Sequence, residues 1–593
     1  MKMKTANRFF VIGCGALALA ASASAGQFTS ALAGDVSFTE TNGWTVSAKT
    51  QRLGDGREKW TLDFAAAKAL PPPETTVTCS FPIRDVVARW HMSAGALPPD
   101  WAGACSSTIY CRIPVAQLFS DTSENRALIA CSDAFRRVSF KLGGREETGR
   151  AVYSATLFSE PEASCTSCRV EFLVDFRPVF YADALRDAMA WYEAMPEYAP
   201  SSVPPAAFDP LYSFWYSYHQ NVTAASVEKE CAAAAKCGFK TIIIDDGWQT
   251  DDNNRGYAYC GDWEVSPNRF PDFPAHVKKV QALGMKYMIW YALPVMGFHA
   301  KSYDRFKGKY LYDYGTLGYS VLDPRFPEVR EYLIGCIERA VRDWGVDGVK
   351  LDFIDALDIC CLDAVHTDPT DPAVKENYAG RDIKTIPHAF DRLMLDLRAR
   401  LEKIRPGVLV EFRQGYVGPA IRKYGNMFRA GDCPMDYRTN RMRTLDLRLT
   451  SGATAVHSDM LMWGAGDSVE TASKQFWSII FAVPQISVRL NEIPAAYREK
   501  IREMVDFWVA HRETLVKGEL RPMRPDLGYP IVYAYGPGEQ VVAVYDESQL
   551  VKIDRAKGAK AFVVNATDAT SLVVEEGASV RRVPMKPCAV TEL

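Results

Sequence analysis

Hydrophobic and polar residues alternate in two different ways along this chain, and the change lies near residue 200. Before that point, apolar residues recur at every second position in short runs that Gly, Pro, Asn and Asp interrupt. The clearest runs are 44–48, 60–64, 137–142, 151–158 and 170–176. This period of two predicts an antiparallel β-sandwich. A helix is expected at 184–193, and four prolines between 200 and 210 indicate a linker.

From residue 211, apolar runs of strand length alternate with segments whose apolar residues recur at helical spacing. The expected strands are 211–218, 241–244, 286–293, 348–354, 408–412, 427–430, 453–457 and 485–490. The expected helices are 224–237, 274–283, 327–344, 387–404, 420–424, 437–449, 469–481 and 495–515. Eight strand–helix pairs predict a (β/α)₈ TIM barrel. Short alternating runs return after residue 519 and predict a small C-terminal β-sandwich domain.

The first residues have the pattern of an export signal. Lys2, Lys4 and Arg8 precede an apolar run at 9–21, and the small residues at 23–25 suit cleavage before Gly26. No later stretch approaches the ~18 to 20 apolar residues of a membrane span. The sequence therefore predicts an exported protein, periplasmic or secreted, without a transmembrane segment. The predicted divisions are a signal peptide at 1–25, an N-terminal β-sandwich at 26–199, the catalytic barrel at 200–518 and a C-terminal β domain at 519–593.

Composition narrows the class of function. The chain has 593 residues, 48% hydrophobic and 24% charged, which is typical of a soluble globular protein. A net charge of -3 gives no electrostatic case for binding nucleic acid. Aromatic residues make up 12%, which suits rings that stack on sugars and equally suits bulky cores. A homo-oligomer is left open.

Fifteen cysteines are present, and export would permit disulfides. Pairing cannot be deduced from sequence, although four cysteines of the β-rich region are candidates: Cys79, Cys105, Cys111 and Cys131. Cys165 and Cys168 form a lone CxxC, for which a surface-loop bridge or free thiols are expected rather than a metal site. Cys360 and Cys361 follow the central strand, and no role is assigned to them.

The strand expected at 348–354 carries two charges, Lys350 and Asp352, at alternate positions. Alternation places both side chains on one face of the strand. Charges in a strand buried on both faces must meet each other or a ligand. A salt bridge at the strand end would satisfy this requirement, and so would a catalytic site.

In a TIM barrel the chemistry lies at the C-terminal ends of the strands. The residues expected there are rich in carboxylates and aromatic rings: Asp245, Asp246, Trp248, Trp263, Trp290, Tyr291, Lys350, Asp352, Glu411, Arg413, Tyr416, Asp432, His457, Asp459 and Arg489. Eight histidines in the whole chain argue against zinc, and neither a Gly-x-Ser-x-Gly elbow nor a phosphate-binding glycine loop occurs. A divalent cation held by carboxylates is the serious alternative. Paired carboxylates, a lysine and aromatic walls point instead to glycoside hydrolysis without metal or cofactor.

Several of these residues also have ordinary structural explanations. Asp245 and Asp246 could form a turn or a helix cap. His457 and Asp459 could satisfy each other as a buried pair. The tryptophans at 248, 263 and 290 could simply pack in the core.

A series of motifs resembles glycoside hydrolase family 36, the α-galactosidase group, which shares a clan with family 27. The motifs are Ile-Asp-Asp-Gly-Trp at 244–248, Gly-Asp-Trp at 261–263, Phe-Pro at 270–271, Gly-Met at 284–285, Trp290, Lys-Leu-Asp at 350–352 and Arg-Ala-Gly-Asp at 429–432. The resemblance spans about residues 211 to 489. It implies a retaining mechanism in which Asp352 matches the nucleophile and Asp432 the acid/base. It also implies that Asp245, Asp246 and Lys350 hold sugar hydroxyls.

The chain departs from the family pattern in three places. Leu351 stands where the family usually has Trp, and Asp436 lies four positions after Asp432 where a second Asp usually lies three after. The segment 411–416 replaces a Cys and a glycine-rich run that lies near the sugar 2-position in relatives. If Glu411, Arg413 and Tyr416 point inward, they crowd that position and favour galactose. If Arg413 pairs with Glu411 or Asp432, space opens for an acetamide.

The sequence therefore predicts an exported exo-acting glycosidase that removes terminal α-linked galactose from an oligosaccharide or glycoconjugate. An α-N-acetylgalactosaminidase with the same mechanism is the alternative. A transglycosidase of the raffinose-synthase kind and a non-catalytic carbohydrate-binding protein are further alternatives. Asp352 must be ionised to attack, with Lys350 lowering its pKa, whereas Asp432 must start protonated and should lie in a drier or more negative setting.

Overall fold

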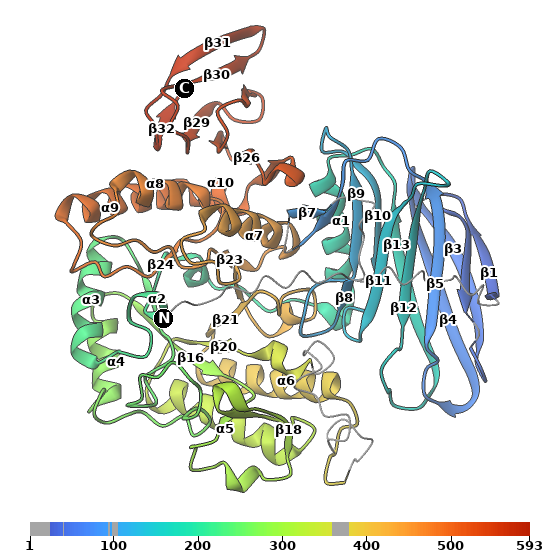
Figure 1. The fold of residues 1–593 in the computed structure, drawn as a ribbon, viewed down its shortest axis with the longest axis horizontal. Coiled ribbons are helices and arrows are strands. Elements are labelled where there is room, and N and C mark those ends of the chain that lie inside the picture. Colours follow the sequence, from blue (N-terminus) through green and yellow to red (C-terminus); the bar gives the residue numbers. More distant parts are fainter. Residues whose placement is uncertain (1–23, 40, 93–94, 98–104, 359–378) are drawn as a thin grey trace, which may run out of the picture.

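The structure is a computed structural model that describes residues 24–39, 41–92, 95–97, 105–358 and 379–593. Residues 1–23 of the expected signal peptide, with Cys360 and Cys361, lie outside the described residues. Figure 1 shows a β-sandwich beside a central barrel, with a small β domain packed over the barrel's last helices. The predicted fold class is confirmed.

Two sheets face each other in the N-terminal domain. One has the order β1-β2-β5-β12-β11-β8 and the other β3-β4-β13-β10-β9-β6-β7. The strands are β1 Ser24–Ser30, β2 Gly34–Thr39, β3 Thr45–Gly54, β4 Arg57–Leu70, β5 Thr75–Pro82, β6 Ala88–His91, β7 Gly95–Leu97, β8 Cys105–Ser107, β9 Val115–Phe119, β10 Asn125–Cys131, β11 Val138–Arg145, β12 Arg150–Leu157 and β13 Cys165–Asp175. Rings from the two sheets meet between them, as where Tyr153 and Phe172 lie 6.4 Å apart at their centroids. Cys79, Cys105 and Cys131 are free thiols, and β1 starts two residues before the expected mature terminus.

The barrel is one sheet of eight parallel strands in the order β23-β22-β21-β20-β16-β15-β14-β24. The strands are β14 Leu211–Ser213, β15 Thr241–Ile244, β16 Lys286–Ala292, β20 Gly348–Asp352, β21 Leu409–Arg413, β22 Met427–Arg429, β23 Ala455–His457 and β24 Gln485–Ile486. A parallel bridge from His457 to Val483 joins the two ends of the sheet. Because both faces are covered, most strand positions are apolar, as Thr241–Ile244 illustrates.

Helices cover the outside of the barrel (Figure 1). They are α2 Trp215–Tyr218, α3 Ala224–Lys236, α4 Phe273–Gln281, α5 Pro327–Asp343, α6 Ile386–Ile404, α7 Tyr437–Thr450, α8 Val469–Ser478, α9 Ala495–Ala510 and α10 Arg512–Lys517. Polar side chains cap several N-termini. Thr223 and Ser226 form a capping box on α3, and Asp436 accepts from the Thr439 N–H at 2.9 Å on α7. Asp436 is thus a helix cap.

Some expected boundaries are wrong. Residues 215–218 form α2 instead of continuing the first strand, and the strand expected at 485–490 ends at Ile486. The helix expected at 420–424 is a short 3₁₀ turn, Ile421–Lys423. The last helix is divided into α9 and α10. A small antiparallel sheet that the pattern did not predict, β17 Val295–Gly297, β18 Tyr310–Tyr314 and β19 Tyr319–Leu322, lies between β16 and α5.

The C-terminal domain has a five-stranded and a three-stranded sheet. Its strands are β25 Glu519–Met523, β26 Ile531–Gly536, β27 Glu539–Val544, β28 Leu550–Ile553, β29 Lys560–Asn565, β30 Ser571–Glu576, β31 Ser579–Pro584 and β32 Ala589–Glu592. It is fixed to α8 of the barrel, where the Trp477 indole N–H donates to the Cys588 carbonyl at 2.9 Å. No described helix has both the length and the apolar character needed to cross a bilayer.

The N-terminal domain is joined to the barrel by helix α1, Tyr181–Glu193, and the linker after it. It also contacts the loops that follow β20 and β21. The Arg112 N–H donates to the Gly415 carbonyl at 3.1 Å, and the Gln414 side chain donates to the Met92 carbonyl at 3.4 Å. Arg137 forms an ion pair with Asp358, which is 4% exposed. The sandwich therefore supports the C-terminal end of the barrel strands.

Candidate active site

Strand β20 delivers Lys350 and Asp352 to the inside of the barrel mouth, as the alternation predicted. In the parallel register, Lys350 lies opposite Trp290 of β16 and Glu411 of β21. The Lys350 ammonium lies 2.6 Å from Asp245 and 3.9 Å from Asp352. Its main partner is therefore Asp245, which directly follows β15 on the far side of β16, so the two charges of β20 are more than a simple pair at a strand end.

Asp352 is held by several donors. Its Oδ1 accepts from Arg413 Nε at 2.9 Å, from the Phe353 N–H at 2.8 Å and from the Tyr416 hydroxyl. Its Oδ2 accepts from the Trp290 indole N–H at 3.1 Å. Burial alone would raise the pKa of this carboxyl, but Arg413, Lys350 and the hydrogen bonds outweigh it and hold the pKa well below its ordinary value. Asp352 is an ionised carboxylate at neutral pH.

The chain turns sharply after Asp352 to make this arrangement. Phe353 has φ +62°, in the left-handed region that residues with a side chain seldom adopt. This turn brings the backbone N–H of Phe353 back onto the carboxylate of the residue before it. Uncommon backbone conformations of this kind cluster at functional sites.

Asp245 and Asp246 end strand β15 and have different partners. Asp245 binds Lys350 and also accepts from the Asp246 N–H at 3.0 Å, so part of its role is to shape the turn. Asp246 accepts from Gln220 at 2.7 Å and from Gln249 at 2.6 Å. Asp246 is 1% exposed, and burial raises its pKa to about 7.

Arg429 of β22 organises the other side of the mouth. Its guanidinium donates to Asp432 at 2.8 Å and to Asp459, and its Nε lies 3.9 Å from a Glu411 oxygen. Glu411 and Asp459 are fully buried, and burial raises the pKa of both carboxyls. One buried cation therefore faces three carboxylates.

Asp432 does not lie in the dry or negative setting expected for it. Its side chain is 49% exposed and is paired with Arg429. Burial of its inner part raises the pKa, but the nearby Arg429, Arg413 and Lys350 outweigh this and lower it. The expectation is wrong because it did not include the arginine three residues earlier. The same interactions show that Asp432 lies within electrostatic reach of the two cations that hold Asp352.

Aromatic side chains form the wall beside Asp352. Trp248 and Trp263 stack with centroids 6.0 Å apart, and Tyr291 packs edge-on against both. Trp248 donates to the Trp290 carbonyl at 3.0 Å. Trp290 is the member of this group that touches the nucleophile candidate, while Trp248 and Trp263, each at most 1% exposed, support it from behind.

The segment after β21 adopts neither of the two arrangements expected for it. Arg413 pairs with Asp352 rather than with Glu411 or Asp432, and its guanidinium lies over the Tyr416 ring at 5.2 Å. Glu411 lies inside the barrel and accepts from Gln485 at 2.6 Å. Arg413 and Tyr416 are thus brought together with the nucleophile candidate, and Glu411 lies beneath it. Their contacts with a sugar stay predictions.

His457 and Asp459 are not a mutual pair. His457 is buried beneath the site, where its ring binds the Ala207 carbonyl at 2.8 Å and Gln485 at 3.2 Å, and burial lowers its pKa to about 4. Asp459 binds Arg429, the Tyr216 hydroxyl at 2.9 Å and the Cys433 N–H at 2.7 Å. Arg489 pairs with Glu492 at 3.1 Å in a more exposed position.

Sequence reasoning missed the neutral and cationic partners of the carboxylates. Asp246 accepts hydrogen bonds from Gln220 and Gln249, Asp459 from Tyr216, and Glu411 from Gln485. These partners are neutral, so no pattern of charged residues in the sequence marks them. Arg429 had a usable signal, because it lies inside the Arg-Ala-Gly-Asp motif at 429–432.

The geometry does not form a cage for a metal ion. Within the described ranges, no group of three or more His, Cys, Asp or Glu side chains could hold one. Asp245 and Asp352 instead bind Lys350 and Arg413. The Tyr416 loop that completes the site rests on the sandwich through Gly415.

Comparisons with known proteins agree with the motifs. Residues 211–375 match the Melibiase family model. The chain is 24% identical over 199 residues to the A type blood α-D-galactosamine galactosaminidase of Flavonifractor plautii, covering 30% of this chain and 18% of that protein. It is 26% identical over 166 residues to the probable α-galactosidase C of Aspergillus terreus, covering 24% and 21%. The match thus spans about a fifth of the length of these curated relatives.

Solved structures show the same architecture over nearly the whole chain. A family 36 α-galactosidase from Geobacillus stearothermophilus superposes with a TM-score of 0.65 at 13% identity, covering 94% of this chain and 82% of that one. An α-galactosidase from Lactobacillus brevis gives a TM-score of 0.58 at 14% identity, covering 89% and 79%. The molecule therefore has the domain architecture of the barrel α-galactosidases. The resemblance to glycoside hydrolase family 36, the group of α-galactosidases and α-N-acetylgalactosaminidases, is confirmed.

The raised pKa of Asp246 predicts a pH-dependent contribution to stability. The unfolded chain releases this proton near pH 4 and the folded chain near pH 7, so the folded state holds one extra proton between these values. Stability should therefore fall as pH rises through this window. Relative to Asp246→Asn, the wild type should lose up to about 4 kcal/mol of unfolding free energy. Urea denaturation of both proteins at four pH values from 4.5 to 7.5 measures this difference, and a constant difference would contradict the assignment.

Proposed function

We propose that the chain is a retaining exo-acting glycoside hydrolase that removes terminal α-linked galactose. The observation that carries the proposal is Asp352, a carboxylate at the C-terminal end of a barrel strand, kept ionised by Arg413, Lys350, Trp290 and Tyr416. Such a group is suited to attack an anomeric carbon. The family resemblance supports this role, since Asp352 matches the family nucleophile.

The first step would form a covalent glycosyl-enzyme at Asp352. An ionised Oδ attacks the anomeric carbon while the acid gives its proton to the leaving oxygen. Ester formation removes the negative charge from Asp352. Because Arg413 and Lys350 stabilise that charge, they make the carboxylate less reactive than a free one. The aromatic wall behind Trp290 fixes the orientation of the carboxylate during attack.

Asp432 would act as the acid and then as the base. Its half-exposed side chain can reach a ligand, and Arg429 is shared with the buried Glu411 and Asp459. A bound sugar would exclude water from Asp432 and raise its pKa, because its counter-ion is already committed to two other carboxylates. After the first step Asp432 would take a proton from water, which attacks the glycosyl-enzyme.

Galactose is favoured because Arg413 and Tyr416, which both contact Asp352, would restrict the space beside the sugar 2-position. Neighbouring family 36 structures were solved in complex with raffinose and stachyose. The galactosaminidase among the relatives keeps N-acetylgalactosamine as a second candidate. Action outside the cytoplasm, directed by residues 1–25, is part of the same proposal.

Replacing the nucleophile should abolish turnover in a way that a small anion restores. Asp352→Ala should lower kcat for a nitrophenyl α-galactoside by at least about 10³-fold. Added azide should restore part of the rate and give the β-galactosyl azide, because it attacks the face that the carboxylate vacates. Product analysis by NMR detects this adduct. Full activity without azide, or an α-configured azide, would contradict the assignment.

Replacing the acid should show a dependence on the leaving group. Asp432→Ala should slow hydrolysis of an unactivated oligosaccharide by about 10²- to 10⁴-fold and that of a good nitrophenyl leaving group much less in the first step. Asp436→Ala is the matched control, since it removes a nearby carboxylate that caps α7. Equal losses on both substrates in Asp432→Ala would exclude the acid role.

The sugar preference is decided by a direct comparison. With nitrophenyl α-galactoside and α-N-acetylgalactosaminide assayed side by side, kcat/KM should be higher for the galactoside because Arg413 and Tyr416 restrict the 2-position. A strong preference for the acetamido sugar would replace the substrate and leave the catalytic roles intact. Hydrolysis of neither glycoside would refute the proposed function.

A further inference from the structure

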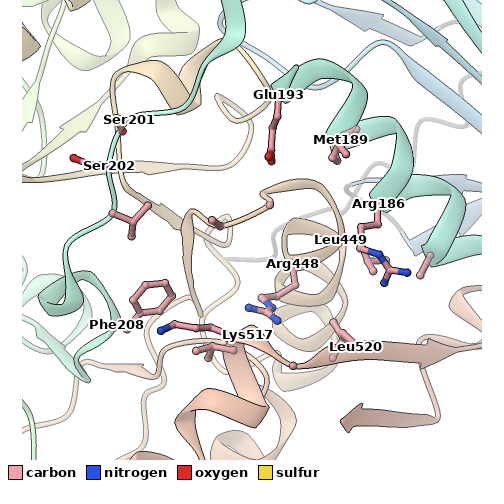
Figure 2. A pocket seen from close by; sticks show the side chains of 17 residues that line it. Arg186, Met189, Glu193, Ser201, Ser202, Phe208, Arg448, Leu449, Lys517 and Leu520 are labelled. Carbon is pink, nitrogen blue, oxygen red and sulfur yellow. The ribbon is translucent and has the colours of Figure 1, made fainter. Parts of the chain in front are cut away.

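A cavity of about 730 Å³ lies where the linker, the barrel and the C-terminal domain meet. Figure 2 shows it between helix α1, the linker, the end of α7 and the junction of α10 with β25. Phe208 precedes β14 and Ala453 precedes β23, so the cavity opens at the N-terminal ends of the strands. It is at the opposite end of the barrel from Asp352.

Most of the wall is apolar. Met189 of α1, Val203 and Phe208 of the linker, Leu449 of α7 and Leu520 of β25 line it. A volume of this size is typical of sites for small organic molecules, which lie in the range of about 300–1,000 Å³. Predominantly apolar walls with few polar groups are also typical of such sites.

Arg448 is a charged residue of this wall. Its Nε is buried and has no hydrogen-bond partner in the described part of the chain. No ion pair or other hydrogen bond of Arg448 is found among the described residues. Burial is the sole cause that lowers the pKa of its guanidinium, to about 10. An uncompensated cation in such a place is costly, and a bound anion would remove that cost.

The other charged groups at the cavity already have partners. Glu193 accepts from the buried Arg422 at 2.5 Å, so it does not neutralise Arg448. Arg186 binds Asp183 at 2.6 Å. Lys517 binds Glu513 at 3.0 Å in an exposed pair, and its ammonium lies 5.2 Å from the centre of the Phe208 ring. Figure 2 shows the side chains of Arg448 and Lys517 extending into the same space.

We propose that this cavity binds a small amphiphilic anion. Its anionic headgroup would bind the Arg448 guanidinium, and Lys517, which also lines the cavity, would add a second positive charge. Its apolar body would pack on Phe208, Met189 and Leu520. Because these residues come from the linker, α1 and the C-terminal domain, an occupant would bind three separate parts of the chain together and stabilise their junction. The proposal does not depend on the reaction catalysed at the other end of the barrel.

The test compares ligands of one length with different headgroups. Isothermal titration of the full chain with octanoate, octyl phosphate and octyl sulfate should show saturable binding of at least one of them. The neutral octanamide should bind much more weakly, because it leaves Arg448 without a counter-charge. The headgroup that binds best identifies whether carboxylate, phosphate or sulfate is the chemistry recognised.

Variants of Arg448 separate the site from general binding of apolar chains. Arg448→Met should raise the Kd of the preferred anion by at least about tenfold, since the charged hydrogen bonds are lost while the apolar volume is kept. Arg448→Lys should retain part of the affinity. Arg392→Met, which removes an exposed arginine of α6, should leave the Kd unchanged.

A stability measurement guards against a variant that merely unfolds. Without ligand, Arg448→Met should have a Tm equal to or above that of the wild type, because it removes an unpaired, partly buried cation. With saturating anion, only the proteins that keep a cation at 448 should gain Tm. The proposal is overturned by an absence of saturable binding of all three anions, by equal binding of octanamide, or by an unchanged Kd in Arg448→Met.

Discussion

The site depends on the shortage of positive charge at the barrel mouth. Lys350, Arg413 and Arg429 face Asp245, Asp352, Glu411, Asp432 and Asp459, so the cations cannot stabilise every carboxylate in its ionised form. The cations are placed unevenly, so the carboxyl groups differ in pKa. Asp352 and Asp432 have lowered pKa values, while Glu411 and Asp459, buried beneath, have raised ones. The pKa of each of these carboxyl groups is therefore set by where the arginines and Lys350 lie as much as by burial.

The order of strands and helices could be predicted because parallel strands buried on both faces are continuous apolar runs. Residues 241–244 illustrate this, and their bounds follow the apolar run closely. The ends of helices and strands could not be predicted where tertiary contacts determine them. Residues 215–218 are apolar enough for a strand but form a helix, and the small sheet of β17, β18 and β19 pairs strands of three to five residues, too short to give a period.

The part of the site that follows from side-chain alternation and from the positions of strand ends could be predicted from the sequence. Lys350 and Asp352 share a face because of the strand period, and Asp245 meets Lys350 because the parallel strands of the barrel end at one edge. Which partner each charge selects depends on side-chain directions across several strands, and no single sequence contains that information. Arg413 was expected either to point inward at the sugar 2-position or to pair with Glu411 or Asp432, and instead it binds Asp352. Gln220 and Gln249 are neutral, so no charge pattern marks them, although they decide the surroundings of Asp246.

The contact between the sandwich and the loop after β21 has a consequence for how the molecule acquires its activity. Tyr416, which donates to Asp352, belongs to a loop whose neighbour Gly415 accepts a hydrogen bond from Arg112, about three hundred residues earlier in the chain. N-terminal domains are generally made and folded first during synthesis. The sandwich is then a ready template on which the later loop is ordered. A barrel that closed without it would have its strands but an Asp352 without this support, so the geometry around Asp352 reports complete assembly of the chain rather than folding of the barrel alone.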